Sequence, residues 1–249
     1  MTDELADGLA EAANAVLRTA DPAEKTGLSR RTAAAWRDLR SEGGDASIGT
    51  AAPPVEPARP PEPLLVAPGD VPRRRRGSLT GRIALLHAIA HIELNAVDLH
   101  WDVIARFAAE DLPLGFFDDW VQAADDESKH FGLLSERLVA LGSHYGAFPA
   151  HAGMWRAARD TADDLEARLA VVPMVLEARG LDVTPGMITL FEQAGDDASV
   201  SALRTIYAEE VSHVAYGSKW FHFLCGRRNE DPKPRFHKLV QRYFPGSLK

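Results

Sequence analysis

Apolar residues recur every three or four positions along most of the chain, which is the period of an amphipathic α-helix. From Ser78 onward this pattern is sustained, and no stretch alternates apolar and polar residues as a half-buried strand would. Glycine and proline residues interrupt the pattern and divide it into long helices. We expect four of them, at about residues 81–110, 116–141, 154–179 and 197–225.

The third of these helices carries the clearest local signals. Pro173 lies inside it and removes one backbone hydrogen bond, which predicts a kink. Gly180 follows as an expected helix end. Thr184 and Pro185 then resemble the start of a further short helix, which Gly195 would end. The connection to the last long helix is therefore expected to contain one short helix.

The first third of the chain has a different composition. Eight of the sixteen prolines fall between Pro53 and Pro72, where neither helix nor strand could persist. Two short helical patterns precede them, and Asp21 followed by Pro22 is a typical helix start. We expect a helical appendage at 1–43, a proline-rich and basic linker at 44–80, a helical bundle at 81–226, and a tail with a short helix at 227–249.

The connection between the second and third long helices is long enough to affect topology. Residues 142–153 could span about 40 Å when extended, and a helix of 25 residues is about 37 Å long. The chain could therefore cross the full length of a four-helix bundle at this point.

Charge and cysteine content narrow the function classes. The 36 acidic residues outnumber the 28 Lys and Arg, so nucleic acid and anionic membranes are disfavoured as partners. The exception is the basic run at residues 73–76. A single cysteine, Cys225, excludes an internal disulfide framework and a multi-cysteine metal site within one chain. With no long apolar run and an acidic amino terminus, we expect a cytoplasmic protein without membrane spans.

Two copies of Glu-x-x-His lie on the second and fourth long helices, and residues three apart share a helix face. The first and third helices each carry one glutamate, Glu93 and Glu177, at a similar distance along the chain before the motif of the next long helix. All four glutamates interrupt otherwise apolar stripes, and burying a carboxylate is costly unless it is paired or bound to metal. The predicted metal ligands are Glu93, Glu127, His130, Glu177, Glu210 and His213.

This ligand set indicates which metals fit. Four carboxylates balance two divalent cations, and carboxylate with imidazole suits iron or manganese. We expect two iron ions, with manganese or a mixed manganese–iron pair left open. The alternative is a bundle without metal in which buried Glu–His pairs compensate one another.

With these residues in place, the sequence resembles the ferritin-like di-iron carboxylate superfamily, and within it a bacterial ferritin-like family of unknown function. The resemblance extends from about Pro72 to Cys225. It rests on the stretches HAIAHIELNAVDL, DDESKH, LAVVPMVLEARGLDVTPGM and YAEEVSHV. It implies a ferritin-like four-helix bundle with a long crossover, and it places all six predicted ligands in metal-binding positions.

The resemblance also implies further site residues. In oxygen-using members an acid commonly precedes the glutamate of each motif and orients the opposite histidine. Asp126 and Glu209 stand in those positions here, although both could instead be surface acids. Tyr207, one turn before Glu210, is a candidate catalytic hydroxyl, with core packing as the alternative.

Three other histidines fall on the first long helix. His91 is two residues before Glu93 and therefore off the site face, which favours a structural role. For His87 and His100 we expect packing or surface roles, with a place along an access route as the alternative.

The expected function is oxidation or hydroxylation of a small organic substrate by dioxygen or peroxide at a di-iron centre. The substrate and electron donor stay undetermined, and an oligomer is compatible with the sequence. A ferroxidase-type storage protein and an RNA-modifying hydroxylase are the alternatives. A rubrerythrin-like peroxidase would need a cysteine-rich module that one cysteine cannot build.

Overall fold

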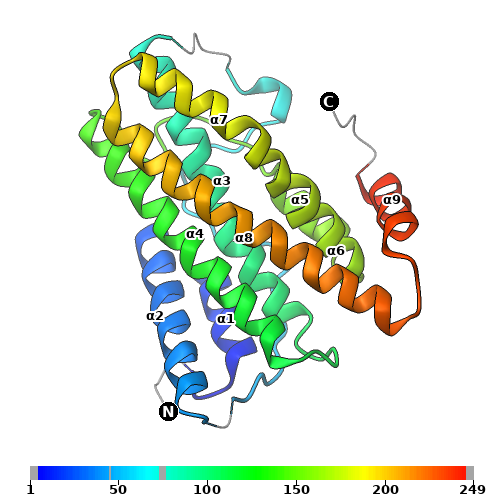
Figure 1. Cartoon of the computed structure of the whole chain (residues 1–249). Coiled ribbons are helices and arrows are strands. Elements are labelled where there is room, and N and C mark those ends of the chain that lie inside the picture. The colour runs from blue at the N-terminus through cyan, green and yellow to red at the C-terminus, as the bar shows by residue number, and fades with distance from the viewer. Residues whose placement is uncertain (1–4, 45, 73–76, 245–249) are drawn as a thin grey trace.

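A computed structural model describes residues 5–44, 46–72 and 77–244. Within these ranges the protein is all-α, with one isolated backbone bridge and no strand. Long helices pack side by side in a bundle, α3 against α4 and α4 against α8 (Figure 1). Their bounds are Leu79–Arg106 for α3, Leu114–Ala140 for α4 and Asp197–Arg227 for α8. None of the helices in the described ranges is long and apolar enough to cross a membrane.

The ends of these helices follow the expected signals closely. The Ser78 hydroxyl accepts the backbone N–H of Gly81 and caps α3, and Asp196 caps α8 through the N–H of Ser199. Gly142 adopts a left-handed conformation with φ of 76° just after α4, as its position predicts. Three of the four long helices are thus confirmed to within a few residues.

The third expected helix is instead a rod of several pieces, and the prediction for it is wrong in two places. Gly180 does not end a helix and Pro185 does not begin one, because both lie inside a single helix, α7 (Ala178–Gln193). This helix packs along α8, and such packing outweighs local propensity. Pro173 does disturb the helix, by widening it into a π-helical turn. The pieces are α5 (Gly153–Asp160), α6 (Leu165–Val171), a π-helical segment (Val172–Glu177) and α7 (Ala178–Gln193).

The π-helical segment lies very close to α8. A Cβ atom added at Gly217 would be 2.5 Å from Cγ of Pro173, well inside van der Waals contact. A residue without a side chain is therefore needed at this point of α8 for the two elements to approach. The approach brings Glu177, the last residue of the segment, next to α8.

The N-terminal helices α1 (Leu9–Arg18) and α2 (Pro22–Ser41) pack directly on the bundle, α1 on α3 and α2 on α4 (Figure 1). Their apolar residues belong to the same core cluster as residues of α3, α4 and α8. Asp21 caps α2 with Pro22 in its first turn, as expected. The two N-terminal helices therefore share a core with the bundle.

The remaining segments lie on this body. The proline-rich stretch contains one short 3₁₀ turn, Pro68–Asp70. Its Leu65 forms a backbone bridge with Ala150, which lies in the connection between α4 and α5. The same connection contacts α3, because its Tyr145 hydroxyl is 2.8 Å from Nδ1 of His91. The last helix, α9 (Pro232–Tyr243), buries Leu239 and Val240. The basic run at residues 73–76 lies outside the described residues.

Candidate metal centre

Six side chains predicted from the sequence converge on one buried point, with α3, α4, the π-helical segment and α8 each contributing. The glutamate of α3 and both motif histidines are almost completely buried, and Glu210 is the most exposed member at 14%. Four chain segments separated by tens of residues are thus brought within contact of one another. The six residues are Glu93, Glu127, His130, Glu177, Glu210 and His213.

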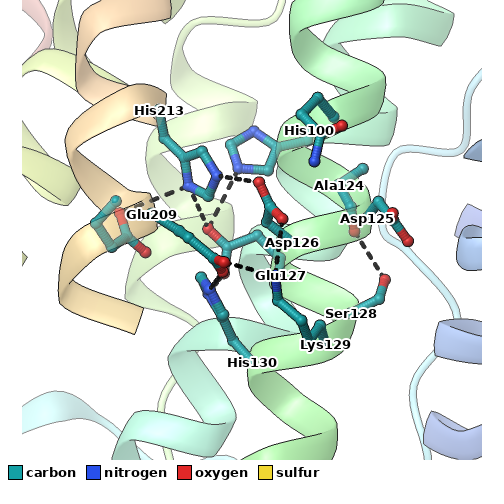
Figure 2. A network of polar contacts seen from close by, with 12 residues as sticks. His100, Ala124, Asp125, Asp126, Glu127, Ser128, Lys129, His130, Glu209 and His213 are labelled. Carbon is teal, nitrogen blue, oxygen red and sulfur yellow. Dashed lines mark hydrogen bonds and ion pairs between the residues drawn. The ribbon is translucent and has the colours of Figure 1, made fainter. Parts of the chain in front are cut away.

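The Glu127 carboxylate lies at the middle of the cluster (Figure 2). Its Oε2 is 3.3 Å from Nδ1 of His130, and its Oε1 is 3.1 Å from Nδ1 of His213. A third imidazole, that of His100, approaches the same Oε1 at 3.5 Å. One carboxylate therefore faces imidazoles from three helices.

The other carboxylates lie around this centre. Glu93 is 3.1 Å from Nδ1 of His130, and Glu210 is 3.7 Å from Nδ1 of His213. Glu177 Oε1 is 3.7 Å from Nε2 of His100. Two sets of groups have ligand atoms within 4.8 Å of one another and could each hold a cation. They are His100, Glu127 and His213, and Glu93, Glu127, His130 and Glu210; the predicted ligand Glu177 belongs to neither set.

His100 is the site residue that sequence reasoning missed. We expected packing or a surface role, yet it is buried with its Nε2 directed at Glu127 and Glu177. The signal was its spacing. Seven residues after Glu93 is two helical turns, so both side chains lie on one face of α3.

Several buried atoms of the cluster lack the partners that burial normally requires. Within the described ranges, both oxygens of Glu177 and the Nδ1 of His213 make no hydrogen bond, and the same holds for Nε2 of His100. Buried polar atoms without partners are rare in folded proteins and costly. Their number here, all aimed at one place, fits a site that binds cations.

The electrostatics of the cluster point the same way. Burial, with the negative charge of Glu127, raises the pKa of Glu93 well above its ordinary value, and burial with Glu210 does so for Glu177. Burial opposes protonation of His130, but Glu127 and Glu93 outweigh it and raise its pKa to about 11. Burial and crowding therefore favour the protonated forms of Glu93 and Glu177. Burial opposes ionisation of Glu127 as well, but the imidazoles around it outweigh burial and lower its pKa well below its ordinary value. Cations would displace the protons that Glu93 and Glu177 hold.

Asp126 and Glu209 lie outside the cluster, and each contacts the histidine on the opposite motif helix. The carboxylate of Glu209, on α8, is 2.7 Å from Nε2 of His130 on α4. Asp126, on α4, is 3.5 Å from Nε2 of His213 on α8. Lys129 joins the two acids, at 2.7 Å from Glu209 and 3.1 Å from Asp126. Each acid thereby engages the outer nitrogen of a histidine and leaves Nδ1 facing the centre.

The remaining candidates make no hydrogen bond or ring contact with the cluster within the described residues. Tyr207 is half-buried, and no hydrogen bond or ring contact in the described part of the chain joins it to the cluster. The ring centroid of Tyr216 is 6.4 Å from that of His213. His91 has the structural role expected for it, since it contacts Tyr145 and the carbonyl of His151. His87 accepts the backbone N–H of Gly146.

Comparison with known proteins places the chain in a family. Residues 18–249 match the family model described as "Protein of unknown function (DUF455)", and the chain belongs to that family. An uncharacterized protein of Haemophilus influenzae is 47% identical over 191 residues, which are 75% of this chain and 66% of the relative. The chain thus spans just under two thirds of that relative's length. No solved structure matches significantly.

Proposed function

We propose that this member of the DUF455 family is a ferritin-like di-iron protein that uses dioxygen or peroxide to oxidise a small organic substrate. The cluster of buried carboxylates and imidazoles is the observation that carries the proposal. Four carboxylates balance the charge of two divalent cations, and the unpartnered oxygens of Glu177 would become ligands. Without cations, the same groups are a costly arrangement of protons and desolvated charge.

The chain's own residues have distinct tasks in this proposal. Glu127 lies between the two candidate positions and would bridge them, while Glu93 and His130 would hold one cation. Asp126 and Glu209 fix the orientation of the histidines. Bound iron would supply the redox chemistry with oxygen. The apolar side chains packed around the cluster keep bulk water away from it.

The polar side of the cluster is where protons can reach it. Glu210, Glu209 and Lys129 are partly exposed, at 14%, 31% and 34%, whereas Glu93 and Glu177 are buried. The outer face between α4 and α8 is therefore the side through which displaced protons leave. Small-molecule oxidation uses such a route, since protons must enter and leave with each turnover.

The first test is metal content together with oxygen consumption. Purified protein loaded anaerobically with ferrous iron is expected to take up two ions per chain and to release protons on binding. When oxygen is then admitted, the loaded protein is expected to consume it. Replacing Glu127 or Glu210 by Ala is expected to abolish binding at one or both positions. Glu136→Ala, an exposed acid on the same helix α4, is the matched control and should bind normally. Failure of the wild-type protein to bind iron contradicts the proposal.

Two further measurements separate the alternatives. Iron storage requires a hollow multi-subunit shell, so a monomer or dimer in light scattering argues against it. An RNA-modifying hydroxylase would depend on the basic run at residues 73–76, and reversing these four charges without loss of turnover would remove that alternative.

A further inference from the structure

We infer that His100 is a seventh ligand of the centre and that it makes the two cation positions chemically unequal. The inference rests on the proposed metal function and adds a residue that neither motif contains. His100 Nε2 faces Oε1 of Glu127 at 3.5 Å and Oε1 of Glu177 at 3.7 Å.

The environment of this nitrogen is unusual for a histidine that only packs. The side chain is 1% exposed, and its Nε2 has no hydrogen-bond partner in residues 5–44, 46–72 and 77–244. The Nε2 atom faces the carboxylates of Glu177 and Glu127. Both oxygens of Glu177 and Oε1 of Glu127 also have no hydrogen-bond partner among these residues. One buried nitrogen and three buried oxygens therefore face one another without hydrogen bonds. A cation bound between them would give these atoms the partner that they lack.

The imidazole is also held rigidly in its place. It stacks on the indole of Trp120, with ring centroids 5.4 Å apart and planes 26° from parallel. On another side it contacts the ring of His213 edge-on at 5.6 Å. Because these rings restrict its rotation, Nε2 stays directed at the carboxylates. A ligand fixed in advance in this way loses little conformational freedom when the cation arrives.

The two positions differ in composition as a result. One set of groups, around Glu93 and Glu210, contains a single imidazole, that of His130. The other contains two imidazoles, His100 and His213, with Glu127. Imidazole suits iron, whereas carboxylate oxygen suits manganese. The position at His100 is therefore selective for iron, and the position at Glu93 accepts manganese more readily.

The decisive variant is His100→Phe, which keeps an aromatic ring against Trp120 but removes the nitrogen. His91→Phe is the matched control, because His91 is a buried histidine on the same helix with no contact to the cluster in the described chain. Circular dichroism and thermal unfolding check that both variants fold. Anaerobic titration with ferrous iron then measures stoichiometry and affinity.

We expect two ions per chain in the wild-type protein and in His91→Phe. In His100→Phe the second ion should bind at least about tenfold more weakly, because a ligand atom is lost. With equal ferrous and manganous ions, the wild-type protein should hold one iron firmly, and His100→Phe should lose this preference. If the His100→Phe variant folds and its affinity for the second ion and its preference for iron over manganese are both unchanged, His100 is not a ligand.

A measurement on the wild-type protein covers the case in which the variant does not fold. Pulsed electron paramagnetic resonance resolves the nitrogen nuclei bound to metal when manganese is added at a concentration that fills both positions, including the weaker one. Three ligating imidazoles support the inference, and two overturn it while leaving the proposed function intact. A wild-type protein that binds no metal contradicts the proposed function itself, so the two failures are distinguishable.

Discussion

At the scale of single residues, the acid that precedes each Glu-x-x-His motif decides which histidine nitrogen faces the centre. Glu209 takes Nε2 of His130 and Asp126 takes Nε2 of His213, so each helix orients the histidine of the other. Lys129 contacts both acids and ties them together. The orientation of the inner groups therefore depends on residues that would not themselves touch a metal.

Removing one of these acids should weaken metal binding without unfolding the protein. In Glu209→Ala, the His130 ring loses its partner at 2.7 Å and is free to rotate. We expect affinity for ferrous iron to fall by about 10- to 100-fold, measured by anaerobic titration. Glu192→Ala, an exposed acid on α7, is the control. Equal affinities in the two variants would show that Glu209 does not position His130.

At the scale of elements, the π-helical segment decides where Glu177 lies. A π turn adds a residue to the helical circuit and rotates the residues after it, and such turns are frequent at functional sites. Here the segment ends at Glu177 and rests against Gly217 of α8. The contact between a proline ring and a glycine therefore places a candidate ligand.

Gly217→Ala is expected to displace the segment. Its Cβ would meet Pro173 at 2.5 Å, and overpacking of this kind costs about 1–3 kcal/mol of unfolding free energy. Iron affinity should fall as well, because Glu177 moves with the segment. Gly180→Ala has open space around its Cβ and should stabilise α7 by about 0.5–1 kcal/mol. Urea unfolding of both variants measures the contrast, and similar effects would contradict it.

The cap of α8 provides a pH-dependent prediction at the same scale. Burial opposes ionisation of Asp196, but hydrogen bonds from Ser199 and Arg137 outweigh it and lower its pKa below 3.8. A lowered carboxyl pKa contributes stability that is present above the ordinary value and is lost as pH falls. Asp196→Asn keeps a capping side chain but loses the charge.

We expect Asp196→Asn to be about 1 kcal/mol less stable than the wild-type protein at pH 7. The difference should shrink as the pH falls from the ordinary carboxyl pKa of 3.8 through the lowered pKa of Asp196, where the wild-type carboxylate takes up its proton. Urea unfolding at pH 7 and across this acidic range measures it. A difference that stays constant with pH would mean that the charge of Asp196 contributes nothing.

At the scale of the whole molecule, the N-terminal helices are joined to the bundle by a buried ion pair. Lys25 of α2 donates to Asp98 of α3, and both side chains are 2% exposed. Lys25 also donates to the carbonyl of Ala58 at 3.0 Å, which holds the proline-rich stretch in place. One ammonium group thus connects three parts of the chain.

Breaking this pair should destabilise the entire fold. Lys25→Met leaves the Asp98 carboxylate buried without its cation, which costs about 3–5 kcal/mol. The double variant Lys25→Met/Asp98→Leu removes both charges and should recover most of that loss. Both are measured by urea unfolding followed by circular dichroism. Equal loss in the single and double variants would contradict an electrostatic origin.

Much of the fold and the candidate site could be predicted from sequence because the signals are local. Helical periodicity located α3, α4 and α8, and caps such as Asp21 and Gly142 located ends. The spacing of Glu-x-x-His placed two candidate ligand types on one face of a helix. The break predicted at Gly180 was wrong because packing on α8 carries the helix through glycine and proline alike.

Sequence alone determined which residues could share a helix face, since that depends only on the 3.6-residue period. Only the tertiary structure decided which faces meet. It turned His100 toward Glu127 and Glu177, and it placed apolar residues of α1 and α2 in the same core as the bundle. These outcomes depend on how helices pack, and packing is set by contacts between residues far apart in the chain, which no local pattern encodes.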